Sequence, residues 1–485
     1  MISYKNLLSL HPQSAQPIYV QLANGLIHLI RSGILKPGTK LPSVRAFATL
    51  LDLHPKTIVA AYSEMVAQDW VYSKPRSGMI VSENLPELKP RTFQPKGQTA
   101  YRTDTTLNAA SIAQKTTPKT DLQYKYVIND GFPDHRLAPI TQLLRHYKDG
   151  FYDGITEKHS MVMDMAGSTK LRMALADYTS QTRAINIGYK NILLTRGAQM
   201  ATYIAAALAI KPGDGVMVGD PGYATASKTF EQLGAKLIRI PVDEEGIDVD
   251  QIERACKKKP KLLYVIPHHH HPTTVTLSAA RRMKLLSLIR EHRFHVIEDD
   301  YDYEFHYTHN PILPLASADH GGYVWYIGSL TKNLFPSMRV GYLIAPESVI
   351  TAGAEYKRLL DIRGDLLFEN ALAALFRNGT MQRHIRKSLK VYQERRDLFC
   401  HLLESELGNS VSFKTPAGGM AVWVRFNKPH DLPGISAAAS GQGLWMSDGI
   451  FYNSSTTQFN GLRMGFASLE EKEMVGIFKI LRKLI

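Results

Sequence analysis

One short segment near residue 330 holds side chains that could bind an aldehyde and a phosphate. In the run WYIGSLTKNLFPSMRVGY, Ser329, Thr331, Lys332 and Arg339 follow a β-rich stretch. A lysine amine can form a Schiff base with an aldehyde, and an arginine with two hydroxyls can hold a phosphate. A lone lysine is more often an exposed cation. The segment therefore predicts a binding site only if other motifs of the chain supply the remaining contacts.

Three consecutive acids end an apolar strand in the run HVIEDDYDYEF. Glu298, Asp299 and Asp300 are followed by Tyr301. Carboxylates at the carboxyl end of a parallel strand lie where open α/β sheets bind ligands. Clustered carboxylates can bind Mg²⁺. Alternatively, one acid can pair with the ring nitrogen of pyridoxal phosphate.

Two further turns decide between these chemistries. The turn TRGAQMA begins a helix whose N–H groups could bind a phosphate. The turn GDPGYAT places Tyr223 after a strand, where an aromatic ring could stack on a planar heterocycle. Each turn is common by itself. The ordered set of turn, tyrosine, acid and lysine–arginine segment indicates a pyridoxal-phosphate site.

Four adjacent histidines, His268 to His271, lie between Pro267 and Pro272. Imidazole is a common metal ligand. Adjacent residues of an extended segment alternate faces, however, so at most two of these rings could converge on one ion. The spacing therefore predicts no metal site.

The elements that must position these residues are arranged in three zones. From about Tyr126 to Ile485, helical segments alternate with short β-rich runs such as LLYVIP, which predicts an α/β domain with a mostly parallel sheet. Residues 83–125 are rich in Pro, Thr, Gln and Lys and predict a flexible linker. Residues 1–82 form a separate pattern of helices and strands. The predicted domains are thus 1–82, 83–125 and 126–485.

The N-terminal zone predicts an α+β winged helix-turn-helix. An amphipathic helix ends near Gly33, and a second helix begins after Ser43 as its N-cap. Pro55 suits the first turn of a third helix, which would bury Ile58, Tyr62 and Met65. Two short strands, WVYSK and GMIVS, flank a basic turn suited to a wing. The close spacing of the second and third helices matches the geometry of a DNA-binding helix-turn-helix. A small helical cap with a basic face would give a similar sequence pattern.

Composition limits the function classes. The chain is 44% hydrophobic and 21% charged, and its net charge of +14 favours a polyanionic partner without identifying one. The apolar runs are too short to span a membrane, and the N-terminus lacks a signal-peptide core, so a cytoplasmic protein is expected. Cys256 and Cys400 form neither a disulfide framework nor a metal pair and are expected to be buried thiols.

The run from Lys36 to Val81 resembles the GntR-family winged helix. The family pattern is present as Pro37-Gly38, Leu41-Pro42-Ser43, Arg45, Thr57-Ile58, Ala61-Tyr62 and Arg76-Ser77-Gly78. The chain has His54-Pro55-Lys56 where relatives often have Ser-Arg or Thr-Arg, which leaves the operator sequence open. The residues expected to contact DNA on this basis are Ser43, Arg45, His54, Lys56, Thr57, Arg76, Ser77 and Gly78.

From Tyr126 onward the chain resembles fold-type I aminotransferases, and the whole chain resembles the MocR subfamily of GntR regulators. The resemblance implies that Lys332 forms the Schiff base with pyridoxal phosphate, that Asp299 pairs with the pyridine nitrogen and that Arg463 receives the carboxylate of an amino acid. The remaining residues implied to contact the cofactor are Ala198, Gln199, Tyr223, His271, Tyr301, Ser329, Thr331 and Arg339. Thr274 stands where the family has Gly, which makes this turn less permissive and leaves its backbone path open. Thr225 stands where some relatives have Arg, so a ligand contact at Thr225 is not carried over.

The resemblance implies a bacterial transcription regulator, cytoplasmic and nucleoid-associated, that binds double-stranded operator DNA as a head-to-tail homodimer. It would sense pyridoxal phosphate, or a small amino compound through an external aldimine. An active aminotransferase with an appended DNA-binding domain is the alternative, because the catalytic residues are present. A complete winged helix has no role in transamination, so the regulator is preferred and any aminotransferase activity is expected to be vestigial. A sensor of pyridoxal phosphate alone is a third possibility.

Overall fold

The computed structural model describes residues 3–12, 14, 16–75, 77–83, 85, 124–152, 164–307, 312–453 and 457–485. The chain divides into two compact units, Met1–Ala113 and Gln114–Ile485. The linker predicted at 83–125 lies almost wholly outside the described residues, so its extent stays a prediction.

The first unit combines helices with a β-hairpin, as a winged helix requires. Ser43 caps α3, its Oγ accepting a 3.3 Å hydrogen bond from the N–H of Ala46, and Pro55 is the first residue of α4. The hydroxyl of Tyr62 on α4 donates to the carbonyl of Pro42 at 2.8 Å and ties α4 to the start of α3. The elements are α1 (Tyr4–Leu7), α2 (Ile18–Arg31), α3 (Val44–Leu51), α4 (Pro55–Ala67), β1 (Val71–Lys74) and β2 (Gly78–Val81).

The core of this unit follows the predicted helical period. Ile58, Tyr62 and Met65 of α4 are buried together with Phe47 of α3. The rings of Phe47 and Tyr62 stack with centroids 6.0 Å apart. The apolar face of α4 is thereby fixed against its neighbours, and its other face is left at the surface.

The second unit is built on an eight-stranded sheet in the order β4-β11-β10-β9-β8-β5-β6-β7. β11 runs antiparallel to both of its neighbours, β7 is antiparallel to β6, and the other pairings are parallel. The strands are β4 (Ile192–Thr195), β5 (Gly215–Asp220), β6 (Lys236–Asp243), β7 (Gly246–Ile247), β8 (Leu262–Val265), β9 (His295–Asp300), β10 (Val324–Ser329) and β11 (Gly341–Ile344).

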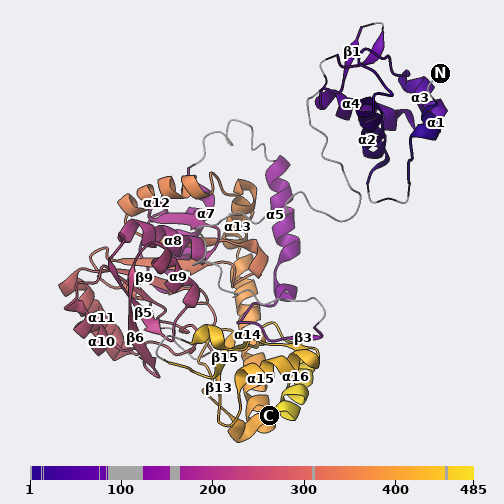
Figure 1. Ribbon diagram of the computed structural model, residues 1–485. Helices are drawn as coiled ribbons and strands as arrows, with labels where there is room; N and C mark the ends of the chain where they lie inside the picture. Colours follow the sequence, from indigo (N-terminus) through magenta and orange to yellow (C-terminus); the bar gives the residue numbers. More distant parts are fainter. Residues whose placement is uncertain are drawn as a thin grey trace. The chain divides into compact units, whose positions relative to one another are not determined.

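Helices cover both faces of this sheet (Figure 1). Along β4, Ile192 and Leu194 pack into one buried cluster and Leu193 into another, so the strand is apolar on both sides. This double burial explains why the strands appear in the sequence as continuous apolar runs. The helices of this part of the chain, not all of which lie on the sheet, are α5 (Ile140–Tyr152), α7 (Thr169–Arg183), α8 (Ala198–Ala209), α9 (Ala224–Gln232), α10 (Val249–Cys256), α11 (Ala279–His292), α12 (Glu347–Leu360), α13 (Leu366–Arg377) and α14 (Thr380–Leu402).

The C-terminal part of this unit has its own core. An antiparallel sheet of β12 (Val411–Phe413), β13 (Ala421–Phe426) and β15 (Gly461–Gly465) packs with α15 (Leu432–Gly441) and α16 (Glu471–Leu484), drawn in orange and yellow in Figure 1. β3 (Tyr126–Val127) pairs with β14 (Leu444–Trp445) and brings the start of the unit to this part. Cys256 and Cys400 are free and buried, as predicted. Of the helices that the structure describes, none is both long and apolar enough to cross a membrane.

Candidate functional site

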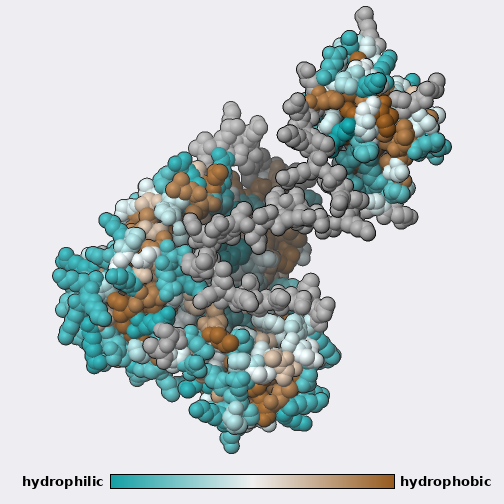
Figure 2. Space-filling model, viewed as in Figure 1, coloured by the Kyte–Doolittle hydropathy of each residue, from teal (hydrophilic) through white to brown (hydrophobic). Residues whose placement is uncertain are grey.

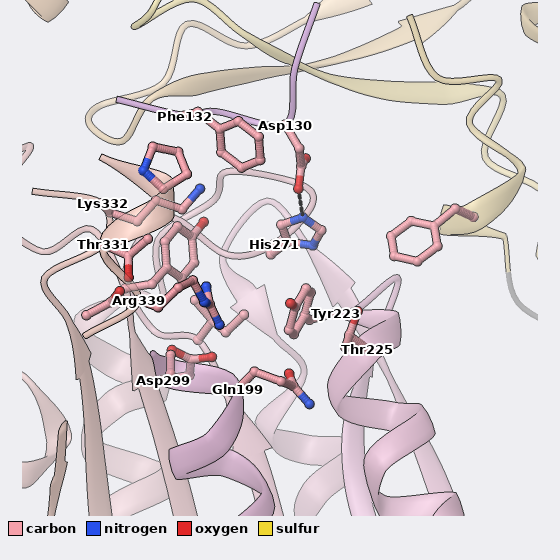
Figure 3. Close-up of a pocket in the computed structure, with 16 residues that line it drawn as sticks. Asp130, Phe132, Gln199, Tyr223, Thr225, His271, Asp299, Thr331, Lys332 and Arg339 are labelled. Carbon is pink, nitrogen blue, oxygen red and sulfur yellow. Dashed lines mark hydrogen bonds and ion pairs between the residues drawn. The ribbon is translucent and has the colours of Figure 1, made fainter. Parts of the chain in front are cut away.

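A cavity of about 380 Å³ lies where several strands of the large sheet end (Figure 3). Asp299 reaches it from β9, Ser329 from the end of β10, and Ala198 from the first turn of α8. All ten residues predicted from the sequence to contact a cofactor line this cavity. The other lining residues are Asp130, Phe132, Thr225, Ile266, Pro336 and Phe451.

One end of the cavity is suited to an anion. Gly197 precedes α8 with φ of 80°, a left-handed conformation that glycine adopts at no steric cost. A Cβ at Gly197 would lie 2.7 Å from a guanidinium nitrogen of Arg339, so the absent side chain lets this arginine reach the start of α8. Within the part of the chain that the structure describes, no side chain caps α8, and its first N–H groups are available to a phosphate.

Lys332 lies in a mostly enclosed position. Its Nζ donates a 2.7 Å hydrogen bond to the carbonyl of Gly131 and lies 4.8 Å from the ring centroid of Phe132. Burial lowers the pKa of Lys332 to about 8, although the carboxylate of Asp130 acts in the opposite direction. More of the amine is therefore unprotonated near neutral pH than in an exposed lysine, which is the form that attacks an aldehyde.

Asp299 has one oxygen bound and one free. Its Oδ2 accepts a 2.6 Å hydrogen bond from the hydroxyl of Tyr264, whereas its buried Oδ1 has no hydrogen-bond partner among the described residues. Burial raises the pKa of Asp299 to about 7, and the bond from Tyr264 opposes this. A protonated ring nitrogen would satisfy Oδ1 and offset the cost of burying the carboxylate.

His271 and Tyr223 form another part of the wall. Their rings meet edge to face with centroids 5.1 Å apart. Nε2 of His271 lies 2.8 Å from Oδ2 of Asp130, the contact dashed in Figure 3, while its buried Nδ1 has no partner among the described residues. Burial lowers the pKa of His271, although Asp130 acts against this. The free nitrogen could bond a polar atom of a ligand in the cavity.

Arg463 does not line the cavity itself. It is 2% exposed on β15, and its Nη2 donates to the hydroxyl of Tyr301 at 3.1 Å. Its Nε lies 3.4 Å from Oδ1 of Asp130. Arg463 thus contacts two cavity-lining residues, and its predicted role as receiver of a ligand carboxylate stays a prediction.

The four adjacent histidines bind four different partners. His268 pairs through Nε2 with the carbonyl of Ile312 at 2.6 Å, and His269 through Nδ1 with Asp302 at 2.8 Å. His270 contacts Thr273 at 2.9 Å. Over the described residues, the structure contains no group of three or more His, Cys, Asp or Glu side chains placed to hold a metal ion. The loop is tied to Asp300 at the end of β9 and to Asp302 beyond it, and Thr274 within the loop has a φ of 60°.

Sequence reasoning missed several residues of the site. Asp130 and Phe132 lie in an irregular segment, Phe451 lies in a short 3₁₀ helix, and Tyr264 has the appearance of a core residue in the run LLYVIP. Only the proximity created by the fold reveals their roles. For Asp130 and Phe132, the neighbouring Gly131 was the one signal in the sequence that could have indicated a turn at the site.

In the first unit, the residues predicted to contact DNA are mostly at the surface. Ser43, Arg45, His54 and Lys56 are exposed, while Thr57 is half-buried. Nδ1 of His54 accepts a 3.2 Å hydrogen bond from the N–H of Lys56 and so caps α4.

The wing is described except at one predicted position. Ser77 is half-buried in the turn, Gly78 begins β2 with φ of 91°, and Arg76 lies outside the described residues. Lys40 forms a β-bridge with Ile80, which places an exposed cation that the sequence reasoning missed beside the hairpin.

Comparison with known proteins divides the chain in the same way. Residues 134–477 match the family described as aminotransferase class I and II, and residues 18–81 match the bacterial regulatory proteins of the gntR family. The chain is 26% identical over 477 residues to the probable rhizopine catabolism regulatory protein MocR of Rhizobium meliloti, covering 96% of this chain and 94% of that protein. It is 26% identical over 470 residues to the transcriptional regulator TauR of Rhodobacter capsulatus, covering 94% of each.

Among solved structures, the chain resembles an archaeal alanine:glyoxylate aminotransferase with a TM-score of 0.69 and 27% identity. The match covers 74% of this chain and 90% of that one.

Proposed function

Because the chain belongs to the class I and II aminotransferase family and carries a DNA-binding domain of the gntR family, we propose that it is a transcription regulator that senses pyridoxal phosphate or a small amino compound. The observation that carries this proposal is one cavity lined by all ten predicted cofactor residues, on a chain that also has the helices and hairpin of a winged helix. An aminotransferase would have no need of the winged helix.

The residues present fit pyridoxal phosphate. Arg339, Ser329 and the N-terminus of α8 would hold the phosphate, and the free Oδ1 of Asp299 would receive the ring nitrogen. When bound, the cofactor supplies an aldehyde that combines reversibly with primary amines. Lys332 would hold the aldehyde carbon through its amine, whose lowered pKa favours the reactive form. Tyr223 and His271 would shield the ring from water.

Regulation requires a ligand that distinguishes two states of the protein. A ligand shifts DNA affinity only as far as it binds the DNA-competent and DNA-incompetent states differently. An amino compound that takes the place of the Lys332 amine would free this side chain, whose Nζ could then donate to the carbonyl of Gly131. We infer that such a local change is the signal passed to the DNA-binding unit.

A head-to-tail homodimer is part of the proposal. Several large apolar side chains of the second unit are exposed: Leu359 is 78% exposed, Ile362 is 70% exposed, and Leu144 of α5 is 60% exposed. Figure 2 shows apolar surface in brown at the position that α12 has in Figure 1. Apolar surface exposed on α12 supports association between copies. A dimer would also supply two recognition helices for paired half-sites.

An active aminotransferase is the second candidate. The completeness of the cavity favours it, as does a 29% identity over 337 residues to aromatic-amino-acid aminotransferase 1 of Thermococcus litoralis. The two candidates differ in what the winged helix does. An enzyme would turn over amino and keto acids many times and would show no sequence-specific DNA binding.

Fluorescence anisotropy with the intergenic DNA beside the gene for this chain tests the proposal. We expect the affinity of the full-length protein for this fragment to change at least fivefold when pyridoxal phosphate, alone or with an amine, is added. The variant Lys332→Ala should lose this response, and Lys170→Ala, which removes an exposed lysine of α7, should keep it. Rapid multiple-turnover amine exchange without specific DNA binding would overturn the proposal in favour of the enzyme.

A further inference from the structure

The carboxylate of Asp130, which lines the cavity, lies beside the guanidinium of Arg463. Its Oδ1 lies 3.4 Å from Nε of Arg463 and accepts a 3.1 Å hydrogen bond from the hydroxyl of Tyr452. Its Oδ2 lies 2.8 Å from Nε2 of His271. Asp130 also lines the cavity, and 42% of its side chain is exposed there. The chain therefore supplies its own carboxylate to the arginine that an amino acid would need.

The position of Asp130 is fixed by the segment around it. Oδ1 of Asn129 accepts hydrogen bonds from the N–H groups of Gly131 and Phe132 at 2.9 and 2.8 Å, and its Nδ2 donates to Ser468 at 2.7 Å. Gly131 has a φ of 79°, and a Cβ there would lie 3.3 Å from Nη2 of Arg463. These contacts fix the turn beside Arg463 of β15. They therefore hold the carboxylate of Asp130 next to this arginine.

We propose that Asp130 makes this cavity selective for primary amines that carry no carboxylate beside the amino group. This inference rests on the proposed function, because it names the class of ligand for the same cavity. It differs from the expectation drawn from the sequence, in which Arg463 receives the carboxylate of an amino acid.

The electrostatics of the wall support this selectivity. A ligand carboxylate that approached Arg463 would lie beside the negative charge of Asp130 in a partly desolvated site, where like charges repel strongly. One nitrogen of Arg463, Nη1, has no hydrogen-bond partner among the described residues, yet its charge is already offset by Asp130.

An ammonium group meets the opposite situation. It gains the attraction of the same carboxylate, which also opposes the lowering of the Lys332 pKa. Asp130 therefore repels a ligand carboxylate and attracts a ligand ammonium group.

The test compares amino acids with the amines that remain when their carboxylate is removed. Isothermal titration calorimetry of the full-length, cofactor-loaded protein would use L-leucine against 3-methylbutylamine and L-phenylalanine against 2-phenylethylamine, because each of these amino acids has a single amino group. We expect the amine of each pair to bind at least tenfold more tightly than its amino acid. In Asp130→Asn this ratio should fall at least tenfold. Asp177→Asn, which removes an exposed carboxylate of α7, should leave it within threefold.

A second variant separates charge from folding. Asp130→Glu keeps the charge and should keep the preference for amines, whereas a merely structural role would make both substitutions equivalent. Equal affinities within each pair for the wild type, or an unchanged ratio in Asp130→Asn, would overturn the inference. Binding of neither ligand by a protein with a normal cofactor absorption band would also overturn it. Failure to bind the cofactor or DNA would instead count against the proposed function.

Discussion

The hydroxyl of Tyr264 donates a 2.6 Å hydrogen bond to Oδ2 of Asp299 and leaves Oδ1 of the same carboxylate without a partner among the described residues. This arrangement is costly when no cofactor is bound. Burial raises the pKa of Asp299 from 3.8 to about 7, so the folded chain holds a proton that the unfolded chain releases above pH 4. The free energy of unfolding of the cofactor-free protein should therefore fall as the pH rises from about 4 to 7.

Asp299→Asn should consequently stabilise the cofactor-free protein and weaken cofactor binding. At pH 8 the substitution removes a buried charge whose cost is on the order of a few kcal/mol, and the melting temperature of the second unit should rise. The gain should shrink as the pH falls from about 7 toward 4 and level off at lower pH, where the acid is neutral in both states. Thermal unfolding by circular dichroism at several pH values checks this. A lower melting temperature at pH 8 would contradict it.

Lys332→Ala should abolish the visible absorption band that the cofactor gives when bound to lysine. Since burial lowers the pKa of Lys332 to about 8, the rate at which the wild-type protein takes up pyridoxal phosphate should rise with pH to a midpoint near 8. Stopped-flow absorbance measures both properties, with Lys170→Ala as the matched control. Survival of the band in Lys332→Ala would show that another amine holds the cofactor.

Gly197→Ala should weaken the binding of the phosphate. The new Cβ would lie 2.7 Å from a guanidinium nitrogen of Arg339, and the residue has a φ of 80°. We expect at least a tenfold loss of affinity for pyridoxal phosphate and a smaller loss for pyridoxal, which lacks the phosphate. Gly213→Ala is the control, because Gly213 has a φ of 93° with nothing within 4 Å of the added carbon. Equal losses for both ligands would place the phosphate elsewhere.

Lys56→Ala and Arg76→Ala should each weaken DNA binding in a way that depends on salt. A lost phosphate contact lowers the slope of the logarithm of affinity against the logarithm of salt concentration by about one. Arg31→Ala, at the exposed end of α2, should leave the slope unchanged. Unchanged slopes for both test variants would mean that the DNA contacts lie on another face.

The sequence predicts the two units and most of the cavity because these features depend on local patterns. The helix starts at Ser43 and Pro55 can be predicted from the residues beside them, and the buried strands can be predicted from their apolar runs. Lys332 and Asp299 can be predicted because the motifs that contain them occur in a recognisable order along the chain. Asp130 could not be found in this way, since it meets His271 and Arg463 from 141 and 333 positions away. Tyr264 was equally hidden, because a tyrosine inside an apolar strand has the same appearance whether or not its hydroxyl has a partner.

The antiparallel strand β11 has a consequence for how the protein acquires its ligand. It joins β4 in the sheet, and the turn before it brings Arg339 to Arg196, which lies 143 positions earlier. Contacts between residues so far apart in the chain carry a large loop-closure cost and are therefore expected to form slowly. The phosphate-binding end of the cavity therefore exists only in a chain whose large sheet is already assembled. Newly made protein would acquire its cofactor at the end of folding, and cofactor-dependent regulation would be confined to molecules that have matured.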